Sequence, residues 1–264
     1  PFPVTLAAKR RQGLMRGAEL FLPGLLAQAR DNYWRFPVFR PMFALAAAGL
    51  PFGLWARSPW LLLAGWSTLY ALAYAALGVT SYFWYYGPVI VGFVALVGLG
   101  AEAAARLVQR GWQNRAMAGA MAAVLAFLVA NPERGGLLYL RDHGDTRQAI
   151  YRATGEWLRA NTPPDTREGP LEVGMIGYYA QRSMVDFAGL LQPAIAQQLG
   201  PASSYDDAAL WAFARYQPDY LVLQDGALPR LQAQATADTR CEVVHTLRDD
   251  LYAFPILILA CPQQ

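Results

Sequence analysis

The sequence is poor in side chains that bind metals or carry out redox chemistry. It has two cysteines and two histidines in 264 residues. Cys241 and Cys261 form no CxxC pattern, and His143 and His245 stand alone, so zinc-type spacing is missing. P-loop and nucleophile-elbow motifs are also missing, and the glycines of VALVGLGAEAAA lie in an apolar run without the strand–turn–helix context of a dinucleotide loop. The pattern predicts no metal site in this chain.

Charge is missing from a long central stretch. Residues 58–101, 44 in all, contain no Asp, Glu, Lys, Arg or His. As one helix they would extend about 66 Å, whereas the hydrocarbon core of a bilayer is about 30 Å thick. The stretch is therefore expected to form two membrane spans joined by a turn at TSYFWYYGP (80–88). Aromatic residues favour the membrane interface, and a role facing the substrate would add to that preference. The residues concerned are Tyr82, Trp84, Tyr85 and Tyr86.

The apolar segments predict an α-helical integral membrane region of about four transmembrane helices, followed by a small α/β soluble domain. The expected spans are 41–56, 59–79, 86–105 and 116–132. Small residues recur in the third and fourth spans, which suits close packing of helices in lipid.

Charge divides the chain near residue 132. Residues 1–132 carry 11 Lys/Arg and 3 Asp/Glu, a net charge of +8, and residues 133–264 carry 11 Arg and 16 Asp/Glu, a net charge of −5. We therefore expect an extracytoplasmic loop and interfacial helix at 1–40, transmembrane helices at 41–132 and an α/β domain at 133–264. The chain opens at PFPVT without Met, so we also expect it to be the C-terminal portion of a longer protein.

The second half alternates between helical and strand patterns. Helices are predicted at 145–160, 192–199 and 205–215, and strands at 171–176, 183–187 and 219–226. A terminal hairpin is predicted from 241–247 and 251–259, with Pro255 placing the last strand at a sheet edge. A turn centred near residue 249 would pair Cys241 with about Leu257, so a disulfide to Cys261 needs a bulge or a twist. The sequence allows either a disulfide between Cys241 and Cys261 or two free thiols.

The N-terminal stretch PFPVTLAAKRRQG concentrates positive charge in Lys9, Arg10 and Arg11. Such a patch suits the phosphate of a lipid-linked donor, with Thr5 supplying a hydroxyl. The alternative is attraction to anionic lipid headgroups.

Four segments resemble polytopic GT-C glycosyltransferases, of the family 39-like and arabinofuranosyltransferase-like kinds, which use polyprenyl-phosphate sugars. The first is the P-x-P-x-T-x-x-A-K pattern of residues 1–9, similar to a PLPNTAYAK-type loop with Val4 in place of Asn, and the second is YFWYYGP at 82–88. The third combines EWLRANTPPD (156–165) with VGMIGYYAQRSMVDFAGLLQP (173–193), which resembles an IGYYSGR-x-VIDLAGL signature. The fourth is PDYLVL at 218–223.

The resemblance implies an enzyme that transfers a hexose or pentose from a polyprenyl-phosphate donor to an extracytoplasmic glycan, lipid or protein acceptor. It implies a multi-pass protein of the cell membrane whose α/β domain lies outside the cytoplasm, although the charge bias of the loops alone supports either orientation. Lys9, Arg10 and Thr5 would bind the donor phosphate. The acceptor-side candidates are Tyr178, Tyr179, Arg182 and Asp186, with a turn cap or a pair with Arg182 as the structural alternative for Asp186.

No residue here matches the family's catalytic Asp, so no catalytic residue is assigned. No cofactor is identified, and a divalent metal is left to a site upstream of this chain. The expected partners are the lipid bilayer, the donor and the acceptor, and nucleic acid is not expected. Two alternatives remain: a membrane transport protein, disfavoured because Glu102 is the ionisable residue found within the spans, and a non-catalytic membrane-anchored binding or assembly module.

Overall fold

A computed structural model describes residues 4–107, 119, 145–237 and 241–261. The chain divides into two compact units. The first, here called the α/β unit, contains Pro1–Ala18 and Leu140–Gln264. The second, here called the helical unit, contains Glu19–Tyr139. The boundaries expected from sequence, at residues 40 and 132, placed residues 1–40 in a segment of their own.

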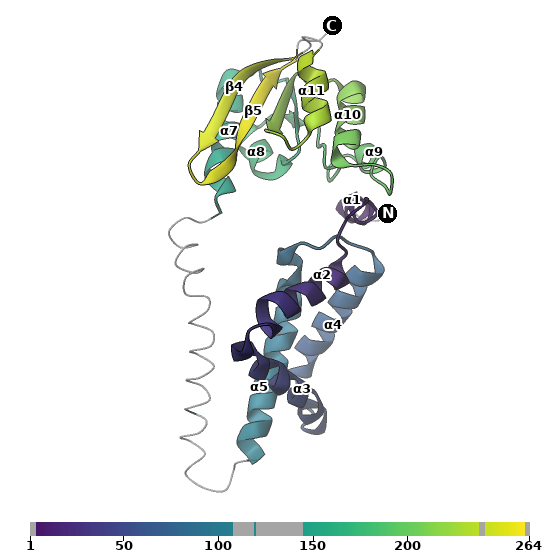
Figure 1. Cartoon of the computed structure of the whole chain (residues 1–264), viewed down its shortest axis with the longest axis vertical. Coiled ribbons are helices and arrows are strands. Elements are labelled where there is room, and N and C mark those ends of the chain that lie inside the picture. Colours follow the sequence, from purple (N-terminus) through teal and green to yellow (C-terminus); the bar gives the residue numbers. More distant parts are fainter. Residues whose placement is uncertain (1–3, 108–118, 120–144, 238–240, 262–264) are drawn as a thin grey trace. The chain divides into compact units, whose positions relative to one another are not determined.

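Among the described residues, the helical unit has three helices of 16 residues or more, and short helices precede them or lie between them (Figure 1). The short elements are α2 (Phe21–Gln28), the π-helix η1 (Ala29–Trp34) and the 3-10 helices η2 (Pro37–Phe39) and η3 (Phe83–Tyr86). The longer helices are α3 (Arg40–Trp55), α4 (Leu61–Ala76) and α5 (Gly87–Leu107).

Glycines let α3 and α4 pack closely against α5. A Cβ atom added to Gly100 would lie 1.9 Å from the carbonyl oxygen of Leu45, and one added to Gly49 would lie 2.0 Å from that of Leu96. A Cβ atom on Gly92 would meet the Ser67 side chain at 2.5 Å. These backbones therefore approach more closely than any other residue would allow.

The expectation of about four transmembrane helices is wrong. Among the described residues, one helix is long and apolar enough to cross a membrane, at Phe83–Arg106 with 24 residues. Helices α3 and α4 have 16 residues each, about 24 Å, which is shorter than a hydrocarbon core of about 30 Å. Helix α4 ends at Ala76, and Gly78 follows two residues later with a positive φ of 64°, which does not continue a helix. The expected span at 116–132 lies outside the described residues.

The α/β unit begins with α1 (Val4–Gly13). The helical unit separates α1 from the rest of the α/β unit in sequence. Its other helices are α7 (Arg147–Asn161), α8 (Val173–Ala180), α9 (Pro193–Ala196), α10 (Tyr205–Tyr216) and α11 (Pro229–Ala237). Its strands are β1 (Arg167–Pro170), β2 (Ser183–Met184), β3 (Tyr220–Gln224), β4 (Glu242–Asp249) and β5 (Tyr252–Ala260).

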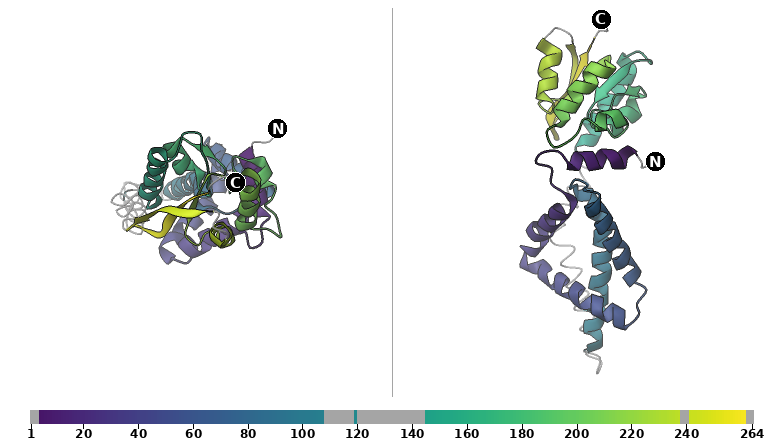
Figure 2. Two further views of the ribbon diagram at one scale, coloured as in Figure 1. Left: turned by 90° about the horizontal axis from the view of Figure 1, so that it is seen from above. Right: turned by 90° about the vertical axis from the view of Figure 1, so that its right-hand side faces the viewer.

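The five strands form one mixed sheet in the order β2-β1-β3-β5-β4. Strands β2, β1 and β3 are parallel, and β5 pairs antiparallel with both β3 and β4. Each face buries a separate core (Figures 1 and 2). Leu221, Leu223 and Leu259 pack against α10 and α11, while Val222 and Ile258 pack on the opposite face with α7 and α8. The alternation of buried side chains along β3 explains why this strand has helices on both faces.

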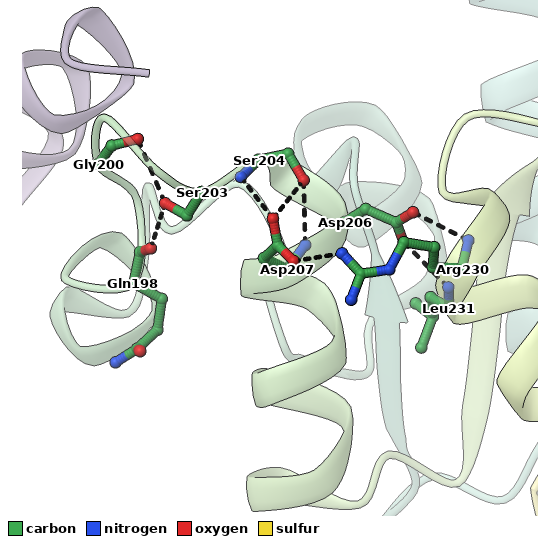
Figure 3. Close-up of polar contacts among 8 residues, drawn as sticks. All are labelled: Gln198, Gly200, Ser203, Ser204, Asp206, Asp207, Arg230 and Leu231. Carbon is green, nitrogen blue, oxygen red and sulfur yellow. Dashed lines mark hydrogen bonds and ion pairs between the residues drawn. The ribbon is translucent and has the colours of Figure 1, made fainter. Parts of the chain in front are cut away.

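Carboxylates fix the two helices of the first face (Figure 3). Asp206 is 8% exposed and accepts hydrogen bonds of 2.9 Å from the backbone N–H groups of Arg230 and Leu231, at the start of α11. Asp207 closes a capping box with Ser204 at the start of α10 and pairs with the Arg230 guanidinium. Both acids therefore cap helices.

The terminal hairpin contains a disulfide between Cys241 and Cys261, whose Cα atoms lie 4.2 Å apart. The hairpin was predicted at almost its observed position, but the predicted register was wrong. Glu242 pairs with Ala260, and irregularities between Val243 and His245 and between Leu247 and Asp249 shift the pairing along the hairpin. The turn lies later than expected, between Asp249 and Tyr252, which alone would set Cys241 opposite Ala260. The irregularities add a net shift of one residue, which sets Cys241 opposite Cys261.

Two strand predictions were also wrong. The predicted strand at 171–176 is the start of α8, and the true strand β1 is the polar segment Arg167–Pro170. Pro255 lies in an interior strand, because β4 and not β5 forms the edge. The proline is tolerated beside the irregularity between Leu247 and Asp249, where the ladder needs no N–H donor.

Candidate functional site

Two neighbouring parallel strands, β1 and β3, are followed by helices on opposite faces of the sheet. After β1 the chain continues into α8 on one face, and after the neighbouring β3 it continues into α11 on the other face. In open α/β sheets this arrangement is a topological switch point, and ligands bind beside the carboxyl ends of its strands. The β1–β3 switch point is therefore the first place to search for a functional site.

Glu172 follows β1 by two residues and lies among charged groups from other elements. Lys9 of α1 and Arg147 of α7 interact electrostatically with its carboxylate. Glu172 is exposed as a residue, but burial of its carboxyl group raises the pKa, and the two cations oppose that rise. Although Glu172 directly precedes α8, its side chain makes no capping hydrogen bond to this helix. Its carboxylate therefore feels two nearby cations and takes no part in helix capping.

Lys9 reaches this edge from the N-terminal helix. Burial lowers its pKa, and the carboxylates of Glu172 and Asp186 partly offset the effect. Two other residues of α1 anchor the helix: Ala8 is fully buried, and Gln12, 1% exposed, donates a hydrogen bond of 3.2 Å to the Ala188 carbonyl oxygen. Gln12 is not among the residues predicted from the sequence, because its partner lies in a distant segment.

A chain of polar side chains continues from α7 to the end of β3. The Tyr151 and Tyr252 hydroxyls lie 3.2 Å apart, and the Tyr252 hydroxyl donates to Gln224 Oε1 at 3.0 Å. Burial raises the pKa of Tyr151, and the hydrogen bond with Tyr252 and the Glu172 charge raise it further. We call Lys9, Arg147, Glu172, Gln224 and Tyr252 the strand-end site. It was missed from sequence because β1, the strand that positions Glu172, was not recognised.

Asp186, a predicted acceptor-side residue, organises its own loop. It is fully buried, and its carboxylate accepts hydrogen bonds of 2.9 Å from the N–H groups of Ala188 and Leu191. Burial raises its pKa, and hydrogen bonds from four backbone N–H groups oppose that rise. The loop contains Gly189 at φ +73°, where an added Cβ would lie 2.6 Å from the Ala196 nitrogen. The predicted turn cap is present, and its negative charge also faces Lys9.

Arg182, another predicted acceptor-side residue, holds the C-terminal end of α7. Its guanidinium donates to the carbonyl oxygens of Arg159 at 2.8 Å and Thr162 at 2.6 Å, and to Thr162 Oγ1 at 3.1 Å. Cations stabilise helix C-termini in this way. Its other donor, Nη1, bonds to the carbonyl oxygens of Ala180 and Gln181, and none of these bonds goes to Asp186.

Glu168 on β1 is fully buried beside this arginine. Its Oε1 lies 3.3 Å from Thr162 Oγ1, while Oε2 has no hydrogen-bond partner among the described residues. Burial raises the pKa of Glu168 to about 7, and Thr162 and Arg182 limit the rise. Glu168 is a buried proton-binding group inside the core and not part of an exposed site.

Tyr178 and Tyr179 lie near the end of α8. Tyr178 is 74% exposed, while Tyr179 is half-buried with the Arg152 guanidinium 5.2 Å from its ring centroid. Of the predicted acceptor-side residues, Tyr178 is thus the most accessible.

The predicted phosphate-binding residues all lie on α1, which is a helix and not a loop. Thr5 and Lys9 are four residues apart and share a face, while Arg10 is exposed on a neighbouring face. Burial lowers the pKa of Lys9, and the Glu172 and Asp186 carboxylates oppose that change.

The predicted aromatic turn belongs to the helical unit and packs around Phe21 of α2, which is fully buried. Tyr86 lies 5.2 Å from the Phe21 ring, and its hydroxyl is 2.7 Å from Ser81 Oγ. Trp84 is exposed and stacks on Tyr82 at 4.7 Å, and Tyr85 contacts Tyr74 at 5.3 Å. The turn is therefore partly a packing core and partly an exposed aromatic surface.

Within the ranges that the structure describes, no group of three or more His, Cys, Asp or Glu side chains is arranged to hold a metal ion. Comparison with known proteins gives one match: residues 139–255 fit a family model described as a domain of unknown function (DUF8728). No curated protein matches the chain, and no solved structure matches it. The matched range corresponds to most of the α/β unit without α1.

Proposed function

We propose that this chain is part of a membrane-associated glycosyltransferase that moves a sugar from a polyprenyl-phosphate donor to an acceptor outside the cytoplasm. The observation that carries the proposal is the docking of α1 on the loop after β2. Gln12 bonds to Ala188, and Lys9 faces Glu172 and Asp186. Two segments resemble polyprenyl-phosphate-dependent transferases most, residues 1–9 and 173–193. Lys9 ends the first segment and Asp186 and Ala188 lie in the second, so the docking of α1 brings Lys9 to the second segment.

The surface of the helical unit supports contact with lipid. Large apolar side chains remain 55–76% exposed along α4 and α5, which is unusual for a surface facing water. These residues include Leu62, Leu69, Leu72 and Val94. We propose that α5 crosses the membrane and that α3 and α4 pack beside it with their exposed apolar side chains against acyl chains.

The disulfide supports an extracytoplasmic α/β unit. Structural disulfides persist in oxidising compartments and are rare in the cytosol. With Cys241 bonded to Cys261, the unit fits the side of the membrane on which polyprenyl-phosphate sugars serve as donors.

A binding module without catalysis is the second candidate. It is favoured by the use of Arg182 and Asp186 in local hydrogen bonds, which leaves no described carboxylate assigned as catalytic base. Such a module would recognise a glycan on the same surface and transfer nothing.

A transfer assay separates the two candidates. The full-length protein, reconstituted in lipid nanodiscs, is incubated with short-chain polyprenyl-phosphate pentoses and hexoses and with a mixture of envelope glycan acceptors. If the chain is part of a transferase, polyprenyl phosphate should be released only when an acceptor is present. Hydrolysis and transfer that both stay at the level of empty nanodiscs would contradict it.

A further inference from the structure

We propose that the strand-end site binds the hydroxyl groups of a neutral sugar. The assignment of this sugar to the acceptor rests on the proposed function, whereas the binding itself does not. The site takes its position from the switch point, since Glu172 follows β1 and Gln224 ends β3. The two strands are direct neighbours, with Pro170 paired to Val222, so their ends lie at one edge of the sheet.

The side chains at this edge supply both donors and acceptors. The Glu172 carboxylate is an acceptor that helix capping leaves unused. Gln224 Oε1 accepts the Tyr252 hydroxyl, and this bond directs the amide so that its Nε2 group, which has no partner among the described residues, remains a donor. Lys9 and Arg147 place positive charge beside the carboxylate, and the Nε and Nη2 groups of Arg147 donate to Asp145. A sugar hydroxyl both donates and accepts, so adjacent hydroxyls suit this alternation of groups.

The charge balance favours a neutral ligand over an anion. Two cations, Lys9 and Arg147, face three carboxylates: Glu172 and Asp186, with which Lys9 interacts, and Asp145, which pairs with Arg147 at 2.8 Å. Asp186 is fully buried in its own loop, so the two cations are balanced at the edge itself by the carboxylates of Glu172 and Asp145, and a phosphate would meet no excess of positive charge there. Hydroxyl groups carry no such penalty, because a carboxylate acceptor strengthens their hydrogen bonds.

Buried polar groups beside the site keep its geometry fixed. Tyr151 is 7% exposed and holds Tyr252 through the hydroxyl contact, while the ring of Tyr151 packs edge-on against that of Tyr252 at 5.8 Å. Gln12 fixes α1, and with it Lys9, through a buried bond to Ala188. A site held by such contacts loses little freedom when it binds a ligand.

The test measures the binding of maltose, lactose and mannobiose to the full-length protein in detergent. Saturation-transfer difference NMR detects the bound sugar. At least one disaccharide is expected to bind, with signals strongest at ring protons next to free hydroxyls. Glu172→Gln should raise its Kd about tenfold or more, because a charged acceptor is lost while the shape is kept. Tyr252→Phe should also raise the Kd, since Gln224 loses its orienting hydrogen bond.

The matched control is Glu156→Gln on the exposed part of α7, where Glu156 pairs with Arg152, and it should leave the Kd unchanged. Absence of binding by all three disaccharides, or a Kd that Glu172→Gln changes less than twofold, would overturn the proposal. Glucose phosphate provides the other arm: if it binds tenfold more tightly than the disaccharides, the neutral class is wrong. Sugar binding that depends on Glu172, in a protein that transfers sugar from none of the donors, would retain this site and reject the transferase.

Discussion

Gln12 donates a hydrogen bond of 3.2 Å to the carbonyl oxygen of Ala188, a residue 176 positions further along the chain. Both groups are buried. The bond fixes α1 on the loop that Asp186 organises, and it brings Lys9 to the carboxyl ends of the parallel strands. The polar surface of the α/β unit is thus assembled from the two ends of the sequence.

Glu168 makes the stability of the α/β unit depend on pH. Its pKa is raised from 4.5 to about 7 in the folded protein, so the folded state binds the proton more tightly than the unfolded state. The free energy of unfolding therefore falls as pH rises through this range, by an amount on the order of 3 kcal/mol. Glu168→Gln should raise the thermal midpoint at pH 8 and have little effect at pH 5. A shift of equal size at both values would show that Glu168 is not protonated in the folded core.

Gly100 is predicted to be essential for the packing of α3 on α5. A Cβ at this position would lie 1.9 Å from the Leu45 carbonyl oxygen, so Gly100→Val should cost about 3 kcal/mol or more. Gly98 is the matched control on the same helix, because a Cβ there meets nothing within 4 Å. Gly98→Ala should be neutral or slightly stabilising. Thermal unfolding in detergent measures both, and equal effects would contradict the close helix crossing.

The disulfide is predicted to stabilise the terminal hairpin. It joins cysteines 20 residues apart, and closing a loop of this size contributes about 3 kcal/mol. Replacing both Cys241 and Cys261 by Ser should lower the thermal midpoint. Alkylation of the denatured wild-type protein should shift its mobility on a gel only if the protein has first been reduced. A shift without reductant would show free thiols.

Orientation in the membrane is predicted from the same disulfide. With both natural cysteines bonded, a new Cys at exposed Ala160 of α7 should react with a membrane-impermeant thiol reagent in intact cells. A Cys at Arg106, at the end of α5, should react after the cells are opened. The reverse pattern would place the α/β unit in the cytoplasm and remove the proposed donor from its reach.

Local patterns predicted only part of the fold. The terminal hairpin and β3 were found because their apolar runs are bounded by turn residues. Strand β1 was missed because Arg167–Pro170 contains two charged side chains, a glycine and a proline, and its burial is decided by the neighbouring strands and α7. The length of α4 was overestimated, at 59–79 against the observed Leu61–Ala76, because hydropathy alone does not locate a helix stop such as Gly78. The expected span 41–56 matches the 16 residues of α3 in length.

The candidate site was predictable to a smaller extent. Lys9 and Asp186 were identified from motifs, but Glu172 and Gln12 were not. Glu172 gains its position from β1, and Gln12 gains its role from Ala188, so both depend on contacts between distant segments. Such contacts leave no periodic signal in a single sequence.

The most direct test of the proposed function compares Lys9→Met with Arg16→Met in a transfer assay on the full-length protein. Methionine keeps the apolar stem of each side chain and removes its charge. Lys9 faces Glu172 and Asp186 at the strand-end site, whereas Arg16 is exposed in the turn after α1. A charge-assisted contact to the substrate is worth about 1.5–3 kcal/mol, so Lys9→Met should lower kcat/KM roughly ten- to hundredfold. Arg16→Met should change it less than about twofold. Equal and small effects of the two substitutions, in a protein that retains its thermal midpoint, would contradict a role for α1 in sugar transfer.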